Sequence, residues 1–285
     1  MKSFNKVFLV GLSTVLLTAC GSGSEEESNN GDGNEDTSWT DVESSGSLVV
    51  GTSGTYAPIT YIDENNELTG FEVELVKEVA DRLGLDIEFS TMDFDGILPA
   101  LRNGQIDVAA HDFAITEERL DTFDFAEPHK YSYGSAVVRE EDKDQFTSAH
   151  DLEGVDVALG SLTSNYAIFA DNIGANGTAY DGGTEAILRD VINGNQSAYL
   201  NDYLVLQRTL EEFGDDRIVL AEDVKYHATE SALAVLKGNE ALEEQISNTI
   251  LELIEEGVVS ELSVEYLGED VSQPADDSDI VSLEG

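Results

Sequence analysis

A strand–helix alternation that runs through the chain twice is the feature that most constrains the fold. The clearest helix spans 71–84, where Phe71, Leu75, Val79 and Leu83 recur at helical spacing. The first series has a strand at 48–53, this helix, a strand at 85–90, a helix at 94–104 and a strand at 106–112. Such alternation is typical of a three-layer α/β unit with a mainly parallel sheet flanked by helices.

The same alternation restarts in the second half of the chain. The second series has strands at 155–159, 178–181 and 197–202, and helices at 164–172, 184–194 and 203–214. Two α/β units in series predict two lobes. A strand at 230–238 and helices at 240–257 and 258–268 remain, and periodicity alone would assign them to the second lobe.

The first twenty residues predict export and a lipid anchor. Lys2 and Lys6 precede the apolar run VFLVGLSTVLL, which has the length of a signal-peptide core and is too short to be read as a membrane span. The run ends in LTAC, which resembles the lipobox of bacterial lipoproteins, and this resemblance implies that Cys20 is lipidated after removal of the signal peptide at 1–20. As the chain's only cysteine, Cys20 has no internal disulfide partner. The alternative is an ordinary secretory signal that happens to end in cysteine.

Acidic segments flank the two predicted lobes. Residues 21–46 are rich in Gly, Ser, Asn and Glu with almost nothing apolar to bury, which predicts a flexible tether. Residues 269–285 form a second acidic tail that is expected to fray. The stretch NNGDGNED superficially resembles a calcium loop, but Glu35 stands where the turn needs a glycine, so no metal is expected there. Trp39, the only tryptophan, lies in the predicted tether and has no functional interpretation.

The charge of the chain excludes several partner classes. With 59 acidic and 14 basic residues the formal net charge is −45, which repels nucleic acid and anionic lipid headgroups. The charge is spread along the chain, which suits a protein outside the cell in high salt and favours a salt-adapted bacterial source. The four histidines form no spaced metal or triad set, and there is no GxxxxGK[ST] loop, so we expect no metal and no cofactor.

Five short motifs carry a resemblance to a known family. GTYAP, GFEVEL, DGILPAL, ITEER and DFAEP occur in this order within 47–268. The chain thereby resembles the bacterial extracellular solute-binding proteins of family 3, which serve ABC importers of polar amino acids, and its first lobe is most similar to cystine-type binders. The resemblance implies a two-lobe periplasmic-binding-protein-like (type II) fold, in which each lobe is a mainly parallel sheet flanked by helices and two crossover hinge strands join the lobes.

The resemblance also implies where the lobes begin and end. Lobe 1 is expected to comprise 47–131 plus 231–268, and lobe 2 to comprise 132–230. The crossovers are placed near 129–133 and 229–232. The strand at 230–238 and the last two helices therefore belong to lobe 1 under this hypothesis.

Two charged residues are expected to bind the two charges of a free amino acid. In the family, the arginine of a T-x-x-R motif takes the ligand carboxylate, and Thr116 and Arg119 match this motif. A planar guanidinium suits a carboxylate bidentately, and the acidic residues around Arg119 are expected to hold it in place; the alternative is a surface salt bridge. The family aspartate that accepts the ligand ammonium matches Asp202, for which helix N-capping is the alternative.

Four further residues match ligand-contacting positions of the family. Tyr56 and Phe94 are expected to pack on the aliphatic part of the ligand, with ordinary core packing as the alternative. Thr163 and Ser164 stand where relatives usually have a Gly-Thr pair before a helix whose first backbone N–H groups meet the carboxylate. The missing glycine puts this backbone contact in doubt.

Three departures from the family pattern bear on specificity. Ala114 stands where many relatives have Ser or Thr, and Ser53 where many have an acid. Asp112 occupies a position that is often Gly or Gln in relatives. If its charge faces the cleft, it favours neutral or cationic ligands over acidic ones; if it turns outward, it only adds to the solvated surface charge.

The expected function is capture of a polar amino acid, cystine-type or another neutral or basic one, for an ABC importer. The chain has no transmembrane permease segment and no nucleotide-binding loop, so the permease and its ATPase are expected to be separate chains. A lipid-anchored monomer at the outer face of the cytoplasmic membrane of a Gram-positive-type or salt-adapted bacterium fits these features. The alternatives are a tethered amino-acid sensor and a cyclohexadienyl-dehydratase-like enzyme on the same fold.

Overall fold

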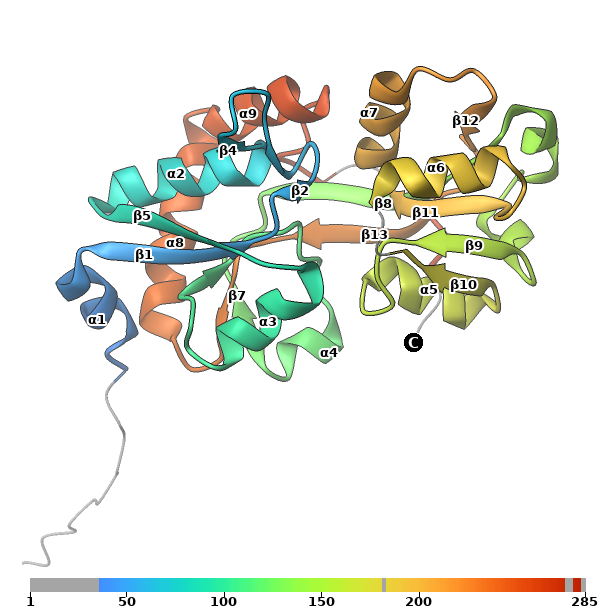
Figure 1. Ribbon diagram of the computed structural model, residues 1–285. Helices are drawn as coiled ribbons and strands as arrows, with labels where there is room; N and C mark the ends of the chain where they lie inside the picture. Colours follow the sequence, from blue (N-terminus) through green and yellow to red (C-terminus); the bar gives the residue numbers. More distant parts are fainter. Residues whose placement is uncertain (1–35, 181–182, 275–278, 283–285) are drawn as a thin grey trace, which may run out of the picture. The chain divides into compact units, whose positions relative to one another are not determined.

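The computed structural model describes residues 36–180, 183–274 and 279–282 (Figure 1). The predicted signal peptide at 1–20, the lipidation site Cys20 and the tether up to residue 35 lie outside the described residues. The chain from Asp36 onward forms one compact unit.

The first lobe is built on a five-stranded sheet with the order β5-β1-β6-β14-β7. Its strands are β1 (Ser47–Thr52), β5 (Asp86–Thr91), β6 (Val108–Ala109), β7 (Phe123–Phe125) and β14 (Ala234–Leu236). Strand β1 pairs in parallel with β5 and β6, whereas β14 is antiparallel to β6 and β7. The chain therefore returns to the first lobe near its end. The family resemblance implied this return, whereas periodicity alone would have assigned the last strand and helices to the second lobe.

Helices cover both faces of this sheet. They are α2 (Phe71–Leu83), α3 (Phe94–Arg102), α8 (Glu240–Glu255) and α9 (Val258–Leu267). The helices α2, α8 and α9 contribute to one apolar cluster with β1, and α3 contributes to a second cluster with β6 and β14. Figure 1 shows α2 and α3 on opposite sides of β1. The apolar stripe predicted at 71–84 is the reason for this arrangement, since Leu75, Val76 and Val79 are all fully buried.

The second lobe is built on a sheet with the order β10-β9-β11-β8-β12, to which β13 adds by pairing with β8. Its strands are β8 (Lys130–Arg139), β9 (Asp156–Leu159), β10 (Asn176–Ala179), β11 (Ala198–Asp202), β12 (Ile218–Leu220) and β13 (Tyr226–Ser231). Strand β9 is parallel to β10 and β11, and β8 is antiparallel to β11, β12 and β13. Each sheet is thus parallel on one side and antiparallel on the other.

Helices again cover both faces of the second sheet. They are α5 (Asn165–Ile173) on one face, with α6 (Thr184–Ile192) and α7 (Tyr203–Phe213) on the other. Two 3-10 turns, η1 (Glu140–Gln145) and η2 (Ala149–Leu152), connect β8 to β9. A three-stranded antiparallel sheet of β2 (Thr55–Tyr56), β3 (Thr60–Ile62) and β4 (Leu68–Thr69) and the short helix α4 (Glu117–Leu120) complete the elements.

Strands β8 and β13 carry the chain between the lobes. They pair in antiparallel register, with Lys130 opposite Ser231 and Ser132 opposite Thr229. At the first-lobe end, the His129 N–H donates to the Ser231 carbonyl at 3.1 Å. These positions lie where the two crossover hinge strands were predicted.

The prediction of a flexible tether through residue 46 is wrong for its last part. Helix α1 (Ser38–Ser45) packs on the first lobe, where Val42 is buried and Trp39 packs against the core. The Asp36 carboxylate accepts from the Ala241 N–H at 2.6 Å, and the Ser38 hydroxyl accepts from the Leu242 N–H at 3.1 Å. This segment therefore satisfies free backbone donors in the first turn of α8, which is a strong reason for it to be ordered.

The prediction of a fraying tail at 269–285 is also wrong for its described residues. Val271 is buried in the core of the first lobe, and its carbonyl accepts from the Tyr131 N–H at 2.9 Å. Val281 bridges to Tyr226 on β13 and packs against the core of the second lobe. Val271 and Val281 thus anchor the tail to both lobes.

None of the helices in the described part of the chain is both long and apolar enough to cross a membrane.

We expect removal of residues 36–45 to lower the free energy of unfolding by about 3–5 kcal/mol. Two capping hydrogen bonds contribute about 1 kcal/mol each, and burial of Val42 and part of Trp39 contributes most of the rest. Urea unfolding followed by circular dichroism, comparing proteins that begin at residue 36 and at residue 46, measures the difference. Equal midpoints would show that α1 is not part of the folded unit.

A single substitution isolates the cap. Asp36→Ala is expected to cost about 1 kcal/mol, because it leaves the Ala241 N–H in the first turn of α8 and the Ser38 N–H of α1 without their carboxylate acceptor. Glu43→Ala, at an exposed position on α1, is the matched control and should leave the midpoint unchanged.

Candidate functional site

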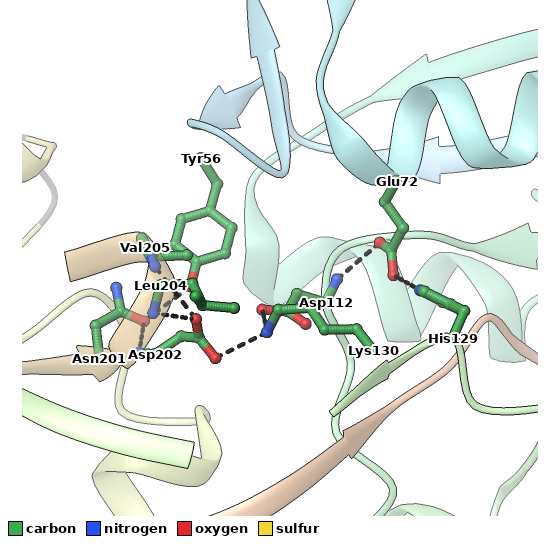
Figure 2. A network of polar contacts seen from close by, with 9 residues as sticks. All are labelled: Tyr56, Glu72, Asp112, His129, Lys130, Asn201, Asp202, Leu204 and Val205. Atoms are coloured by element: carbon green, nitrogen blue, oxygen red, sulfur yellow. Dashed lines mark hydrogen bonds and ion pairs between the residues drawn. The ribbon is translucent and has the colours of Figure 1, made fainter. Parts of the chain in front are cut away.

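The predicted binding residues lie on segments that the two sheets bring to one region. Ala114 and Arg119 follow β6, Tyr56 lies on β2, and Asp202 ends β11 of the second lobe. The Tyr56 hydroxyl donates to the Asn201 side-chain oxygen at 2.8 Å, which joins residues 145 positions apart in the sequence. The candidate site is therefore formed by residues of both lobes (Figure 2).

Arg119 is a buried cation without a carboxylate partner. Its guanidinium Nη1 donates to the Ala114 carbonyl at 2.7 Å, and its Cζ lies 5.2 Å from the centre of the Phe113 ring. Only 9% of the residue is exposed, and burial lowers the pKa of Arg119 from its ordinary value. Within the described part of the chain it forms no ion pair.

The acidic residues around Arg119 do not hold it, contrary to the sequence-based expectation. Glu117 and Glu118 are exposed, and the Asp124 carboxylate accepts instead from the Gly238 N–H at 3.0 Å. Helix α4 leaves both glutamates exposed to solvent, whereas Arg119 on the same helix is buried. The buried guanidinium contacts only one carbonyl oxygen and one aromatic ring, so most of its N–H donors remain available to an anion.

Asp202 is fully buried at the start of α7 and acts as its N-cap. Its Oδ1 accepts from the N–H groups of Leu204 and Val205 at 2.9 and 3.2 Å (Figure 2). Its Oδ2 accepts from the Lys130 ammonium at 2.7 Å. The N-capping interpretation of Asp202 is thus what the structure shows, and a lysine fills the position expected for a ligand ammonium.

Sequence reasoning missed Lys130. It is the first residue of the crossing strand β8, its side chain is 1% exposed, and its Nζ also lies 3.0 Å from Asp112 Oδ2. Burial alone would lower the pKa of Lys130, but the carboxylates of Asp112 and Asp202 outweigh it and raise the pKa above its ordinary value. The available signal was a lysine at a predicted crossover in a chain that has only 14 basic residues.

Asp112 is a buried ion-pair partner, so the outward-facing interpretation is wrong. Its backbone has φ 55°, and its N–H donates to Glu72 Oε2 at 2.7 Å, while Glu72 Oε1 contacts His129 Nε2 at 2.9 Å (Figure 2). Burial opposes ionisation, but the Lys130 ammonium outweighs it and the pKa of Asp112 lies below its ordinary value. Asp112 Oδ1 is buried without a hydrogen bond of good geometry among the described residues, although the Ser231 hydroxyl is near enough to lower the pKa further.

Aromatic rings form an uncharged wall beside these charges. The His111 ring stacks on Tyr56, with centres 5.1 Å apart, and lies 5.0 Å from Phe94, which stacks on Phe113. The Ser53 hydroxyl lies 2.7 Å from His111 Nε2. Burial lowers the pKa of His111 to about 4, so the imidazole is neutral near pH 7.

Thr163 and Ser164 lie on the second-lobe loop before α5 and bond within the protein. The Ser164 hydroxyl caps α5 by accepting from the Ala167 N–H at 3.2 Å. The Thr163 and Ser161 hydroxyls both donate to Asp95 Oδ1 of the first lobe at 2.7 Å. This loop therefore connects the lobes, a role that the sequence did not suggest for Asp95.

The structure groups the predicted residues into three sets. Arg119 lies with Ala114; Ser53, Tyr56 and Phe94 gather around His111; and Lys130 joins Asp112 to Asp202. Thr163 and Ser164 belong to the interlobe loop instead. Within the described residues no cluster of His, Cys, Asp and Glu could hold a metal ion. The arrangement places buried charged groups beside aromatic rings, which suits the binding of a small charged ligand.

Known proteins show the same organisation. The model of bacterial extracellular solute-binding proteins, family 3, matches residues 48–269. The probable ABC transporter extracellular-binding protein YckB of Bacillus subtilis (strain 168) is 38% identical over 267 residues, 92% of this chain and 91% of that protein. The L-cystine-binding protein TcyA of the same strain is 33% identical over 274 residues, 95% of this chain and 99% of that protein.

A solved structure extends the likeness to the fold. The crystal structure of B. subtilis YckB matches with a TM-score of 0.72 and 38% identity, covering 86% of this chain and 99% of that one. The chain belongs to the bacterial extracellular solute-binding proteins of family 3.

Proposed function

We propose that this protein is the substrate-binding lipoprotein of an ABC importer and captures a neutral polar amino acid, with L-cystine as the first candidate. The observation that carries the proposal is a buried, unpaired Arg119 in the same site as an excess negative charge. The name of TcyA as an L-cystine-binding protein supports the choice of cystine.

The charges of the site match those of a zwitterion. Arg119 offers a cation that lacks an anion, which suits a ligand carboxylate. Asp112, Lys130 and Asp202 together carry one negative charge in excess, and we assign a ligand ammonium to Asp112 Oδ1, which has no hydrogen bond of good geometry among the described residues. Since His111 is neutral and its neighbours are aromatic, the remaining wall favours a side chain without net charge. Asp112 therefore contributes to ammonium binding without favouring a net cationic side chain.

Closure of the lobes completes capture under this proposal. Tyr56 with Asn201, and Asp95 with Ser161 and Thr163, are interlobe contacts that opening would break. The ligand is held by Arg119 on the first lobe and by the carboxylates of Asp112 and Asp202 at the lobe interface. It therefore binds the closed form more tightly than the open form and shifts the equilibrium toward closure. The closed form is then presented to a permease and an ATPase that are separate chains.

The setting of the protein is part of the proposal. We place it as a monomer on the outer face of the cytoplasmic membrane of a Gram-positive-type or salt-adapted bacterium, anchored through lipid on Cys20. Under this proposal the site binds without turnover: His111 stacks on Tyr56, contacts the tilted ring of Phe94 and is hydrogen-bonded to Ser53, so it is held in place as part of the wall and is not free to move as a proton donor. Radiolabelled palmitate or mass spectrometry of the N-terminal peptide tests the anchor at Cys20.

Calorimetric titration tests the ligand. The protein lacking residues 1–20, which retains the compact unit from Asp36 onward, is titrated with cystine, glutamine, arginine, histidine and glutamate. We expect one-to-one binding of a neutral amino acid, with cystine tightest. Failure of every amino acid to bind folded protein would contradict the proposal.

Arg119→Ala is expected to weaken binding by about 2–5 kcal/mol, roughly 30-fold to several-thousand-fold, because it leaves the ligand carboxylate buried without a partner. Arg102→Ala is the matched control, since Arg102 is an exposed arginine at the end of α3 and should leave the affinity unchanged. Near-normal ligand affinity of Arg119→Ala would show that Arg119 does not bind the ligand carboxylate and has only a structural role.

We expect His111 to make the folded state acid-sensitive. Its pKa falls from 6.5 to about 4 on burial, so the unfolded chain takes up a proton in this window that the folded protein excludes. The stabilisation is complete above pH 6.5 and is lost as the pH falls toward 4, by up to about 3 kcal/mol.

The measurement is urea unfolding of wild type and His111→Gln from pH 7 to pH 4, because the difference between the two proteins cancels the titration of the other acids. The stability advantage of wild type should shrink across the window. A constant difference would mean that His111 is charged or exposed in the folded protein.

A further inference from the structure

We propose that Lys130 is a specificity-determining residue: it is an internal cation held between two carboxylates, and it thereby excludes ligands whose side chain carries a net positive charge. This deepens the proposed function and rests on it. The juxtaposition that supports it is the Lys130 ammonium held 3.0 Å from Asp112 Oδ2 and 2.7 Å from Asp202 Oδ2, with its side chain 1% exposed.

Both carboxylates are held in place from sides other than Lys130. Asp202 is fixed through Oδ1 by two N–H groups at the start of α7. The backbone of Asp112 is fixed by Glu72, which is itself bonded to His129. The pair would therefore keep its geometry without the lysine, as a rigid two-carboxylate site for an ammonium.

The position of the subsite relates it to the ligand. Asp112 follows β6 of the first lobe directly after His111, whose ring packs on Tyr56 and Phe94. Arg119 lies seven residues further along the same connection to β7. A ligand whose carboxylate is on Arg119 and whose side chain is net cationic would thus meet Lys130 in place of a carboxylate pair, and like charges repel strongly where they are buried.

Shortening Lys130 should therefore change which ligands bind, beyond any general weakening. Lys130→Ala leaves two carboxylates and the space of the lysine stem, which suits a cationic side chain. We expect the ratio of arginine affinity to neutral amino-acid affinity to rise by at least about tenfold in Lys130→Ala, and to stay as in wild type in Lys130→Arg. Lys143→Ala is the control for charge, since Lys143 is an exposed lysine on η1 paired with Glu140.

A second measurement does not depend on the amino-acid ligand. n-Propylammonium reproduces the end of the lysine side chain and should raise the melting temperature of Lys130→Ala above that in equal sodium chloride, with no such effect on wild type. Tetramethylammonium, which has no N–H donor, should raise neither. If wild type binds no amino acid but n-propylammonium still rescues Lys130→Ala, the proposed function fails while the cation subsite stands.

Two outcomes would overturn the inference. One is an equal loss of affinity for neutral and basic amino acids in Lys130→Ala; the other is the absence of rescue by n-propylammonium. Either would make Lys130 only a structural link between Asp112 and Asp202. If Lys130→Ala does not fold, the double variant Lys130→Ala/Asp112→Asn replaces it in both measurements. The second substitution removes the repulsion between the Asp112 and Asp202 carboxylates and keeps Asp202.

Discussion

The antiparallel pairing of β8 with β13 is the constraint on which the rest of the structure depends. It brings the chain out of the first sheet and back into it, so segments before residue 130 and after residue 231 share one core. As a result, the end of β6 faces the end of β11, although the two are about ninety residues apart in the sequence. The polar ends of strands from two separate sheets can then act on one ligand, which is the usual place for a site in α/β folds.

Charge burial is the second organising factor. The chain carries a net charge of −45, yet several of its buried charged groups are close partners around the start of the crossing strand β8. Lys130 offsets part of the repulsion between Asp112 and Asp202, and His129 contacts Glu72. Burying such charges is costly unless each has partners, so Arg119, the one buried arginine or lysine without an ionic partner among the described residues, is where a ligand is most strongly implied.

Local patterns predicted the fold well because they depend on neighbouring residues. The helix at 71–84, the strand before Asp202 and the α7 N-terminus all follow from periodicity and capping rules. The role of Lys130 could not be predicted in this way, since its partners lie 18 and 72 positions away. Helix α1 was missed for the same reason: its own sequence is polar, and its stability comes from donors of α8 about 200 residues later.

The helix α1 has a spectroscopic consequence. The chain's single indole, Trp39, is fixed on the core of the first lobe by α1, whereas the candidate site is lined by tyrosine, phenylalanine and histidine rings. Tryptophan emission therefore reports on the packing of α1 against the first lobe, since the indole is not one of the rings around His111.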